Sequence, residues 1–204
     1  MAICDGYRMM LNPHSPWYAW DGWNTRLFLA INHAGDNAVW NNAARLGTAL
    51  GDHHLLPVYL GLALTIAMRW PRVLPVRSVL VYTWANLLLF FMIYGVLKPW
   101  ANFPRPLSVF GRQAVHVLGE PRFVHSFPSG HAAFAAALAA SFAFSLPRPW
   151  GILLWIFALW VWWSRIAVGA HFPADVIGGA LIGILCALAA HGLAKLWVRG
   201  GNSA

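Results

Sequence analysis

The stretch "HSFPSGHAAF", residues 125–134, decides the fold class of this chain. A proline, a serine, a glycine and a histidine stand directly in front of a long apolar run that is rich in alanine. Ser129 and Gly130 are predicted to stand where a helix begins, with His131 in its first turn. Small side chains let neighbouring helices approach closely, which is how membrane bundles pack. The histidine therefore lies at the entrance of a predicted membrane helix.

The whole chain has the composition of a membrane protein. Only 10% of its 204 residues are charged and 59% are apolar, whereas soluble proteins average about 25% charged residues. A membrane helix needs about 20 apolar residues, with roughly 17 to 25 tolerated. Stretches that approach this length lie near residues 54–70, 78–98, 130–147, 150–168 and 174–197. We therefore predict an all-α fold, a polytopic membrane helix bundle with five transmembrane helices.

The N-terminal part of the chain is harder to place in a membrane. Residues 17–50 are unclear, because "RLFLAI" is followed from residue 32 by "NHAGDNAVWNNAARLGTALGD", which is too polar to cross lipid unshielded. We predict an N-terminal interfacial and helical segment over residues 1–50 and a helical membrane core over residues 51–204, in a single domain overall. A sixth span in the first segment stays open.

The basic residues predict the orientation of the bundle. If five spans alternate, one side carries Arg69, Arg72, Arg77, Arg148, Lys195 and Arg199. The positive-inside rule makes that side cytoplasmic. The loops at 98–129 and 168–173 then lie on the extracytoplasmic side. The net charge of +8 does not predict nucleic-acid binding, because the basic residues stand at span ends and in loops rather than on one face.

Three polar clusters border those two outer loops. They are "KPWANFPRP" at residues 98–106, "PSGH" at 128–131 and "SRIAVGAHFPAD" at 164–175. Because each cluster stands at the outer end of a predicted span, we expect all three at one level of the membrane. Ionisable groups at membrane helices are costly and usually mark function.

The residue types in these clusters suit phosphate chemistry. Lys98, Arg105 and Arg165 can surround a phosphoryl group, since each arginine guanidinium can form bidentate hydrogen bonds with two of its oxygens. The Ser129 hydroxyl and the free N–H groups near Gly130 are predicted to point at the same anion, helped by the positive end of the helix dipole.

The histidines suit nucleophilic and acid–base roles. Asp175 follows His171 by four residues, where its carboxylate can hold one ring nitrogen and leave the other free to attack phosphorus. His131 can protonate the leaving alcohol and then activate water. No metal and no cofactor is expected, because the cations neutralise the transferred group.

Together the clusters resemble the three-part signature of the type 2 phosphatidic acid phosphatase superfamily, which comprises membrane lipid phosphatases, glucose-6-phosphatases and soluble vanadium haloperoxidases. The first part is matched by Lys98, six intervening residues and Arg105-Pro106, and the second by Pro128-Ser129-Gly130-His131. The third is matched by Ser164-Arg165, five residues, His171, three residues and Asp175.

The resemblance implies catalytic roles for three residues and phosphate binding by five. His171 is the expected phosphorylated nucleophile, Asp175 its orienting partner and His131 the general acid. The expected phosphate ligands are Lys98, Arg105, Ser129, Gly130 and Arg165. His125 and Ser126 are possible supporting groups.

The expected function is metal-independent hydrolysis of the terminal phosphate of a lipid phosphate or diphosphate, through a phosphohistidine. The resemblance to small bacterial enzymes places the protein in a bacterial inner membrane, with its site facing the periplasm. Phosphatidylglycerol phosphate, undecaprenyl diphosphate and phosphatidic acid all stay open as substrates. A lipid phosphotransferase with the same site and a non-hydrolytic anion-binding or transport protein are the alternatives. The sequence leaves the oligomeric state open.

Overall fold

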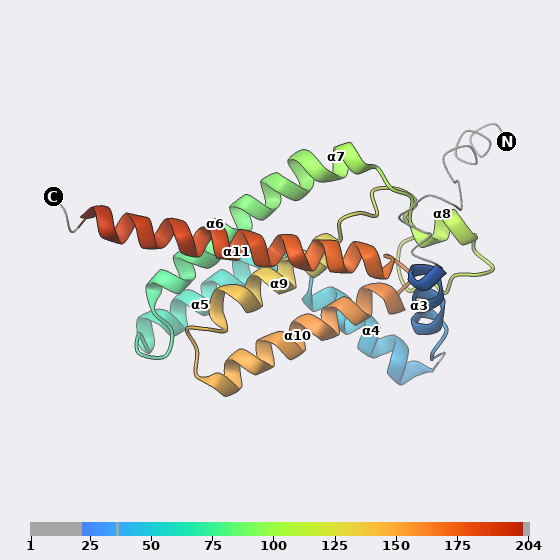
Figure 1. Ribbon diagram of the computed structural model, residues 1–204. Helices are drawn as coiled ribbons and strands as arrows, with labels where there is room; N and C mark the ends of the chain where they lie inside the picture. Colours follow the sequence, from blue (N-terminus) through green and yellow to red (C-terminus); the bar gives the residue numbers. More distant parts are fainter. Residues whose placement is uncertain (1–21, 36, 202–204) are drawn as a thin grey trace.

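The protein is described by a computed structural model that covers residues 22–35 and 37–201 (Figure 1). Within these residues every regular element is a helix and no strand is present, which confirms the predicted all-α class. Residues 1–21 of the predicted N-terminal segment lie outside the described residues.

The elements follow one another along the chain with mostly short connections. In order they are α3 (Trp23–Asn32), α4 (Ala38–Leu50), η2 (His53–Leu55), α5 (Leu56–Arg69), α6 (Val76–Phe90), η3 (Phe91–Leu97), α7 (Lys98–Ala101), α8 (Pro106–Phe110), α9 (Gly130–Phe142), α10 (Arg148–Ala167) and α11 (Pro173–Gly201). The turn at η2 and the π-helical stretch at η3 interrupt otherwise α-helical segments.

A helix stands at each of the five places where a span is predicted. Three segments are long and apolar enough to cross a membrane, namely Val76–Phe110, Arg148–Ala167 and Pro173–Lys195. The two other helices, α5 with 14 residues and α9 with 13 residues, are shorter than a usual span. The structure therefore shows a bundle with three candidate spans, and the total of five stays a prediction.

Helix α9 forms the centre of the bundle, between α11 and α10 in Figure 1, and it also contacts α6. Every residue of α9 except His131 is buried, and most of these residues are alanine. Because alanine side chains are small, three neighbouring helices can pack directly against the α9 backbone. The start of α9, which carries the "PSGH" cluster, is thereby held in a fixed place.

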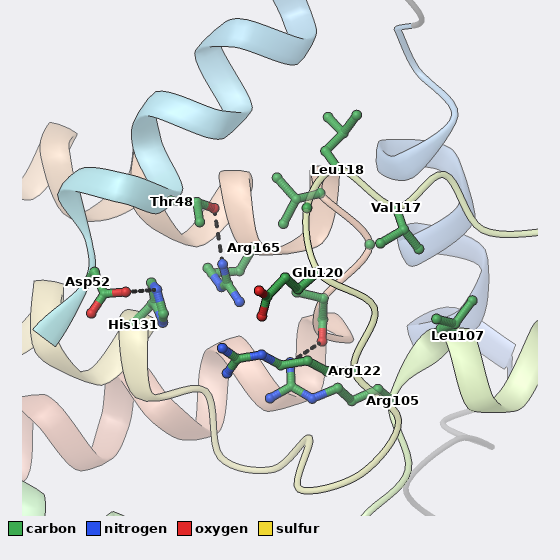
Figure 2. Close-up of a pocket in the computed structure, with 14 residues that line it drawn as sticks. Thr48, Asp52, Arg105, Leu107, Val117, Leu118, Glu120, Arg122, His131 and Arg165 are labelled. Carbon is green, nitrogen blue, oxygen red and sulfur yellow. Dashed lines mark hydrogen bonds and ion pairs between the residues drawn. The ribbon is translucent and has the colours of Figure 1, made fainter. Parts of the chain in front are cut away.

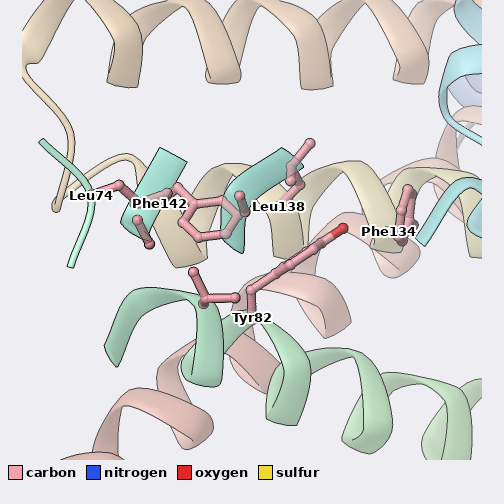
Figure 3. Close-up of a cluster of buried hydrophobic side chains, with 8 residues drawn as sticks. Leu74, Tyr82, Phe134, Leu138 and Phe142 are labelled. Carbon is pink, nitrogen blue, oxygen red and sulfur yellow. The ribbon is translucent and has the colours of Figure 1, made fainter. Parts of the chain in front are cut away.

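An aromatic cluster fixes α9 from the side of α5 and α6. Figure 3 shows Tyr82 of α6 facing Phe134 and Phe142 of α9, and the Tyr82 ring centroid lies 5.0 Å from that of Phe142. Leu74 and Leu138 complete the labelled group.

The outer surface of the bundle is apolar. Large side chains such as Leu87 of α6, Ile156 of α10 and Leu185 of α11 are more than half exposed. Such a surface suits a lipid environment and is rare on soluble monomers. The exposed side chains therefore agree with the membrane location that the composition predicts.

Helix α4 lies against α10, although it comes from the polar N-terminal part of the chain. Trp40 and Trp163 meet edge to face with centroids 4.8 Å apart, and Trp160 Nε1 donates to the carbonyl of Ala43 at 3.2 Å. This packing carries the C-terminal end of α4 towards the end of α10, where the third polar cluster begins.

Candidate active site

The three predicted clusters meet at one end of the bundle. The start of α8, the start of α9, the end of α10 and the turn before α11 supply their side chains. A cavity of about 210 Å³ lies among them, and Arg105, His131 and Arg165 line it (Figure 2). The other predicted site residues are not among those that line it.

Arg105 lies at the centre of the hydrogen-bond network. Its side chain is buried, and its Nε and Nη1 donate to the carbonyls of Val124 and Ala170, each at 3.0 Å. Nη1 also lies 3.4 Å from Nε2 of His171. Among the described residues its hydrogen-bond partners are backbone carbonyls and an imidazole, so no carboxylate there neutralises its positive charge, which remains available to an anion.

Arg165 approaches the cavity from the last turn of α10. Its Nη1 donates to the hydroxyl of Thr48 at 3.1 Å. Its Nε is buried and has no hydrogen-bond partner among the described residues. A buried guanidinium is costly unless it is paired, so the site suits an anionic ligand.

His171 lies behind Arg105 and is only 2% exposed. Because arginine can only donate, the contact with Arg105 leaves the lone pair on Nε2 and the ring proton on Nδ1. Burial, together with the positive charges of Arg105 and Arg165, holds the pKa of His171 well below its ordinary value. The imidazole is therefore neutral near pH 7, which is the form that a nucleophile needs.

Asp175 lies on the other side of His171, as the spacing of four residues predicts. Its Oδ2 is 3.6 Å from Nδ1 of His171, which is longer than a hydrogen bond. The same oxygen accepts hydrogen bonds from the hydroxyl of Ser126 at 2.6 Å and from the backbone N–H of Phe172 at 2.9 Å. Ser126 thus supports Asp175 directly.

Ser129 and Gly130 stand at the start of α9, where the sequence places them. Ser129 is the N-cap, and its hydroxyl accepts from the N–H of Ala132 at 3.5 Å. Its own N–H donates to the carbonyl of Asp175 at 3.0 Å, which joins the second cluster to the third. His131 follows and points into the cavity (Figure 2).

Lys98 lies apart from the cavity wall. Its Nζ donates to the carbonyl of His125 at 3.3 Å and lies 5.5 Å from the centre of the Tyr94 ring. The structure therefore brings Arg105, His131 and Arg165 to the cavity, with His171 and Asp175 behind Arg105 and with Lys98 outside the lining.

Four polar residues that the sequence analysis does not single out also line the cavity. They are Thr48 and Asp52 from the end of α4 and the turn after it, and Glu120 and Arg122 from the loop before α9 (Figure 2). None belongs to the three clusters. Small residues four positions apart, Gly47 and Gly51, were the available sign that α4 packs closely on another helix.

Comparisons with known proteins identify the family to which the chain is similar. A model of the PAP2 superfamily matches residues 78–199, which include all eight predicted site residues. The putative undecaprenyl-diphosphatase YbjG of Escherichia coli is 28% identical over 180 residues, which cover 82% of this chain and 81% of that protein. The lipid A 1-phosphatase of Rhizobium etli is 43% identical over 58 residues, but this match spans only 28% of the chain and 25% of that relative's length.

Two solved structures are similar over most of the chain. The crystal structure of Aquifex aeolicus LpxE has a TM-score of 0.72 and 28% sequence identity, and the match covers 83% of this chain and 94% of that one. A PAP2-type phosphatidylglycerolphosphate phosphatase from Bacillus subtilis has a TM-score of 0.65 at 22% identity, with 96% and 97% covered, and it shows the same fold. On the extent of the family match, the chain belongs to the PAP2 superfamily.

Proposed function

We propose that this protein is an integral-membrane phosphatase that hydrolyses the terminal phosphate of a lipid phosphate or diphosphate through a phosphohistidine on His171. The observation that carries the proposal is the pair formed by His171 and Arg105. A buried neutral imidazole directs its lone pair at a guanidinium that lines a polar cavity. An anion-binding protein has no need of a nucleophile held in this tautomer.

The proposed reaction has two steps. First, Nε2 of His171 attacks phosphorus, the P–O bond to the leaving group breaks, and the leaving oxygen takes a proton from His131. Second, His131 removes a proton from water, the water oxygen attacks phosphorus, and the P–N bond returns its electron pair to His171. Arg105 and Arg165 stabilise the charge on the transferred group in both steps. Ser129, Gly130 and Lys98 are the further proposed phosphate ligands.

An apolar cavity next to the polar one supports a lipid substrate. It has a volume of about 540 Å³ and is lined mainly by side chains of α5, α6 and η3, including Leu60, Leu87 and Phe90. His53 and Gly130 also line it, and they are the chain neighbours of Asp52 and His131 in the polar cavity. The two cavities therefore share these two short backbone segments in their linings. A lipid can place its phosphate in one cavity and its chain in the other.

Names of relatives support this substrate class. A lipid A 1-phosphatase and an undecaprenyl-diphosphatase are among them, and a phosphatidylglycerolphosphate phosphatase shares the fold. We place the enzyme in a bacterial inner membrane, with residues 51–204 as its helical core and with the site facing the periplasm.

The test is phosphate release by the purified protein in detergent. The panel contains phosphatidylglycerol phosphate, undecaprenyl diphosphate, phosphatidic acid, a lipid A phosphate and glucose 6-phosphate. We expect inorganic phosphate from at least one lipid, and none above background from a folded His171→Ala variant. Transfer of the phosphate to a second lipid instead of water would identify a phosphotransferase. Binding of the lipids without turnover would contradict the proposal.

A further inference from the structure

The side chain of His131 faces a carboxylate that lies outside the three clusters. Oδ2 of Asp52 is 3.5 Å from Nε2 of His131, and Figure 2 shows the two groups directed at each other across the cavity wall. The other oxygen, Oδ1, accepts from the backbone N–H of His54 at 2.9 Å and lies 2.7 Å from its Nδ1. One oxygen of Asp52 thus caps the η2 turn, and the other is left for His131.

The fold holds Asp52 firmly in this position. A Cβ atom on the preceding Gly51 would lie 2.4 Å from Cγ1 of Val161, so the end of α4 rests directly on α10. One turn earlier, Thr48 accepts a hydrogen bond from Arg165. Two residues four positions apart therefore contact two different site residues. A mobile surface carboxylate would not be fixed in this way.

The contact with Asp52 determines which nitrogen of His131 can act. A carboxylate can only accept, so the proton on Nε2 is directed at Asp52. Nδ1 is then the nitrogen left to face the substrate. The pKa of Asp52 lies below its ordinary value, chiefly because of the contact with His131. The Asp52 side chain is therefore ionised.

Asp52 works against a strongly positive environment. The titratable groups around His131 are drawn from several elements. His53, Arg165 and His171 interact with its charge, and Arg105, Glu120 and Arg122 line the same cavity. Tyr94 lies beside the neighbouring Gly130, and the carbonyl of Asp175 accepts from Ser129. Burial of the ring and the positive charge of Arg165 disfavour a protonated imidazole. The carboxylate of Asp52 favours it, and a general acid must be protonated before it can act.

We infer that Asp52 is the positioning residue of the general acid: it orients His131 with Nδ1 towards the leaving group and stabilises the protonated ring. The inference rests on the proposed function. In the first step the proton leaves Nδ1 of His131 for the leaving oxygen, while the Nε2 proton stays directed at Asp52. In the second step Nδ1 takes a proton from water, and Asp52 again stabilises the cation that forms.

The test compares two leaving groups on substrates of similar chain length. Hexadecyl phosphate has a poor alcohol leaving group that needs a proton, whereas 4-hexadecyl-2-nitrophenyl phosphate has a good leaving group that does not. Asp52→Asn keeps the shape and the helix-capping oxygen and removes the charge. We expect kcat for hexadecyl phosphate to fall by about 10²-fold, the lower end of what general acids contribute. The nitrophenyl substrate should lose much less.

The pH profile gives a second readout. In Asp52→Asn the basic limb of kcat for hexadecyl phosphate should move to lower pH by about one unit, because the protonated ring has lost its opposite charge. Asp52→Glu retains a carboxylate and should keep the basic limb near the wild-type position. His54→Gln is the matched control, because it contacts Asp52 only from the exposed side, and it should leave both rates and the profile unchanged.

The outcomes separate the inference from the proposed function. The inference is overturned if folded Asp52→Asn loses kcat equally for both substrates. It is also overturned if the basic limb of the pH profile does not move. In either case Asp52 is only a structural cap. If the wild-type protein releases phosphate from neither substrate and from no lipid of the panel, the proposed function itself is wrong.

Discussion

At the scale of single residues, His171 is the group whose environment most narrowly defines its chemistry. It is buried and neutral, and Arg105 and Asp175 lie on its two sides. A brief exposure to substrate labelled on the terminal phosphate, followed by an alkaline quench, should leave label on the protein that is stable to base and labile to acid. His171→Ala should lose this label completely. Label retained in that variant would remove His171 from the nucleophilic role.

The charges around the cavity make a second prediction at this scale. Three arginines line it, and of its two carboxylates Asp52 is engaged by His131 and His54. Magnesium prefers several oxygen ligands in an octahedron, which this lining does not offer. Phosphate release should therefore survive EDTA, and vanadate should inhibit it by forming a five-coordinate adduct with a histidine. Activity that is lost in chelator and restored by magnesium would contradict the proposed mechanism.

At the scale of elements, the parts of the site that could be predicted are those that share one helix end. Asp175 follows His171 across the start of α11, and Ser129 precedes His131 at the start of α9, so local spacing carries the information. Asp52 could not be found in this way. It reaches His131 only because α4 packs on α10, and a contact between distant helices leaves no periodic pattern in the sequence.

The same limit applies to the helices themselves. The places of the apolar helices followed from hydrophobic length, because a lipid-facing helix needs an apolar surface. The length of α9 could not be predicted from hydrophobicity, because this helix is enclosed by protein. It ends at Phe142, several residues before the predicted limit at 147. Lys98 stays a proposed phosphate ligand, but it is not among the residues that line the polar cavity, and its distance from the lining could not be read from local spacing.

The contact between α9 and α11 makes a prediction at the scale of elements. A Cβ atom on Gly183 would lie 2.1 Å from the carbonyl oxygen of Ala133, so the two backbones touch there. Gly183→Ala should force them apart and destabilise the protein by about 1–3 kcal/mol, as overpacked cores do. Thermal unfolding in detergent measures the loss.

Gly192, on the same helix, is the matched control for this substitution. Nothing lies within 4 Å of a Cβ built on it. Gly192→Ala should therefore leave the unfolding temperature unchanged or raise it slightly, since alanine favours helix over glycine. Equal effects of the two substitutions would show that the close approach of α9 and α11 does not limit stability.

At the scale of the whole molecule, the polar and apolar cavities predict a preference for long chains. Burial of an alkyl chain contributes about 25 cal/mol per Å², which a soluble phosphate cannot gain. In a chain-length series in detergent, kcat/KM should rise with chain length and exceed that for glucose 6-phosphate by far. Equal efficiency for the sugar phosphate and a long-chain lipid would refute entry through the apolar cavity.

A substitution in the apolar cavity sharpens this test. Thr83 lines the cavity, whereas Leu80, one turn away on α6, is exposed and does not. Thr83→Trp should raise KM for long-chain substrates and leave short-chain substrates nearly unchanged. Leu80→Trp should alter neither value, which separates filling of the cavity from a general effect of tryptophan on α6.

The enclosure of α9 also bears on how the protein is made. Ribosomes deliver the chain from its N-terminus, so α9 emerges before α10 and α11, the two helices that later cover most of it. A helix of 13 residues is too short to cross the bilayer alone. Its insertion must therefore wait for its partners, and the catalytic end of the bundle exists only once the last helix has been synthesised.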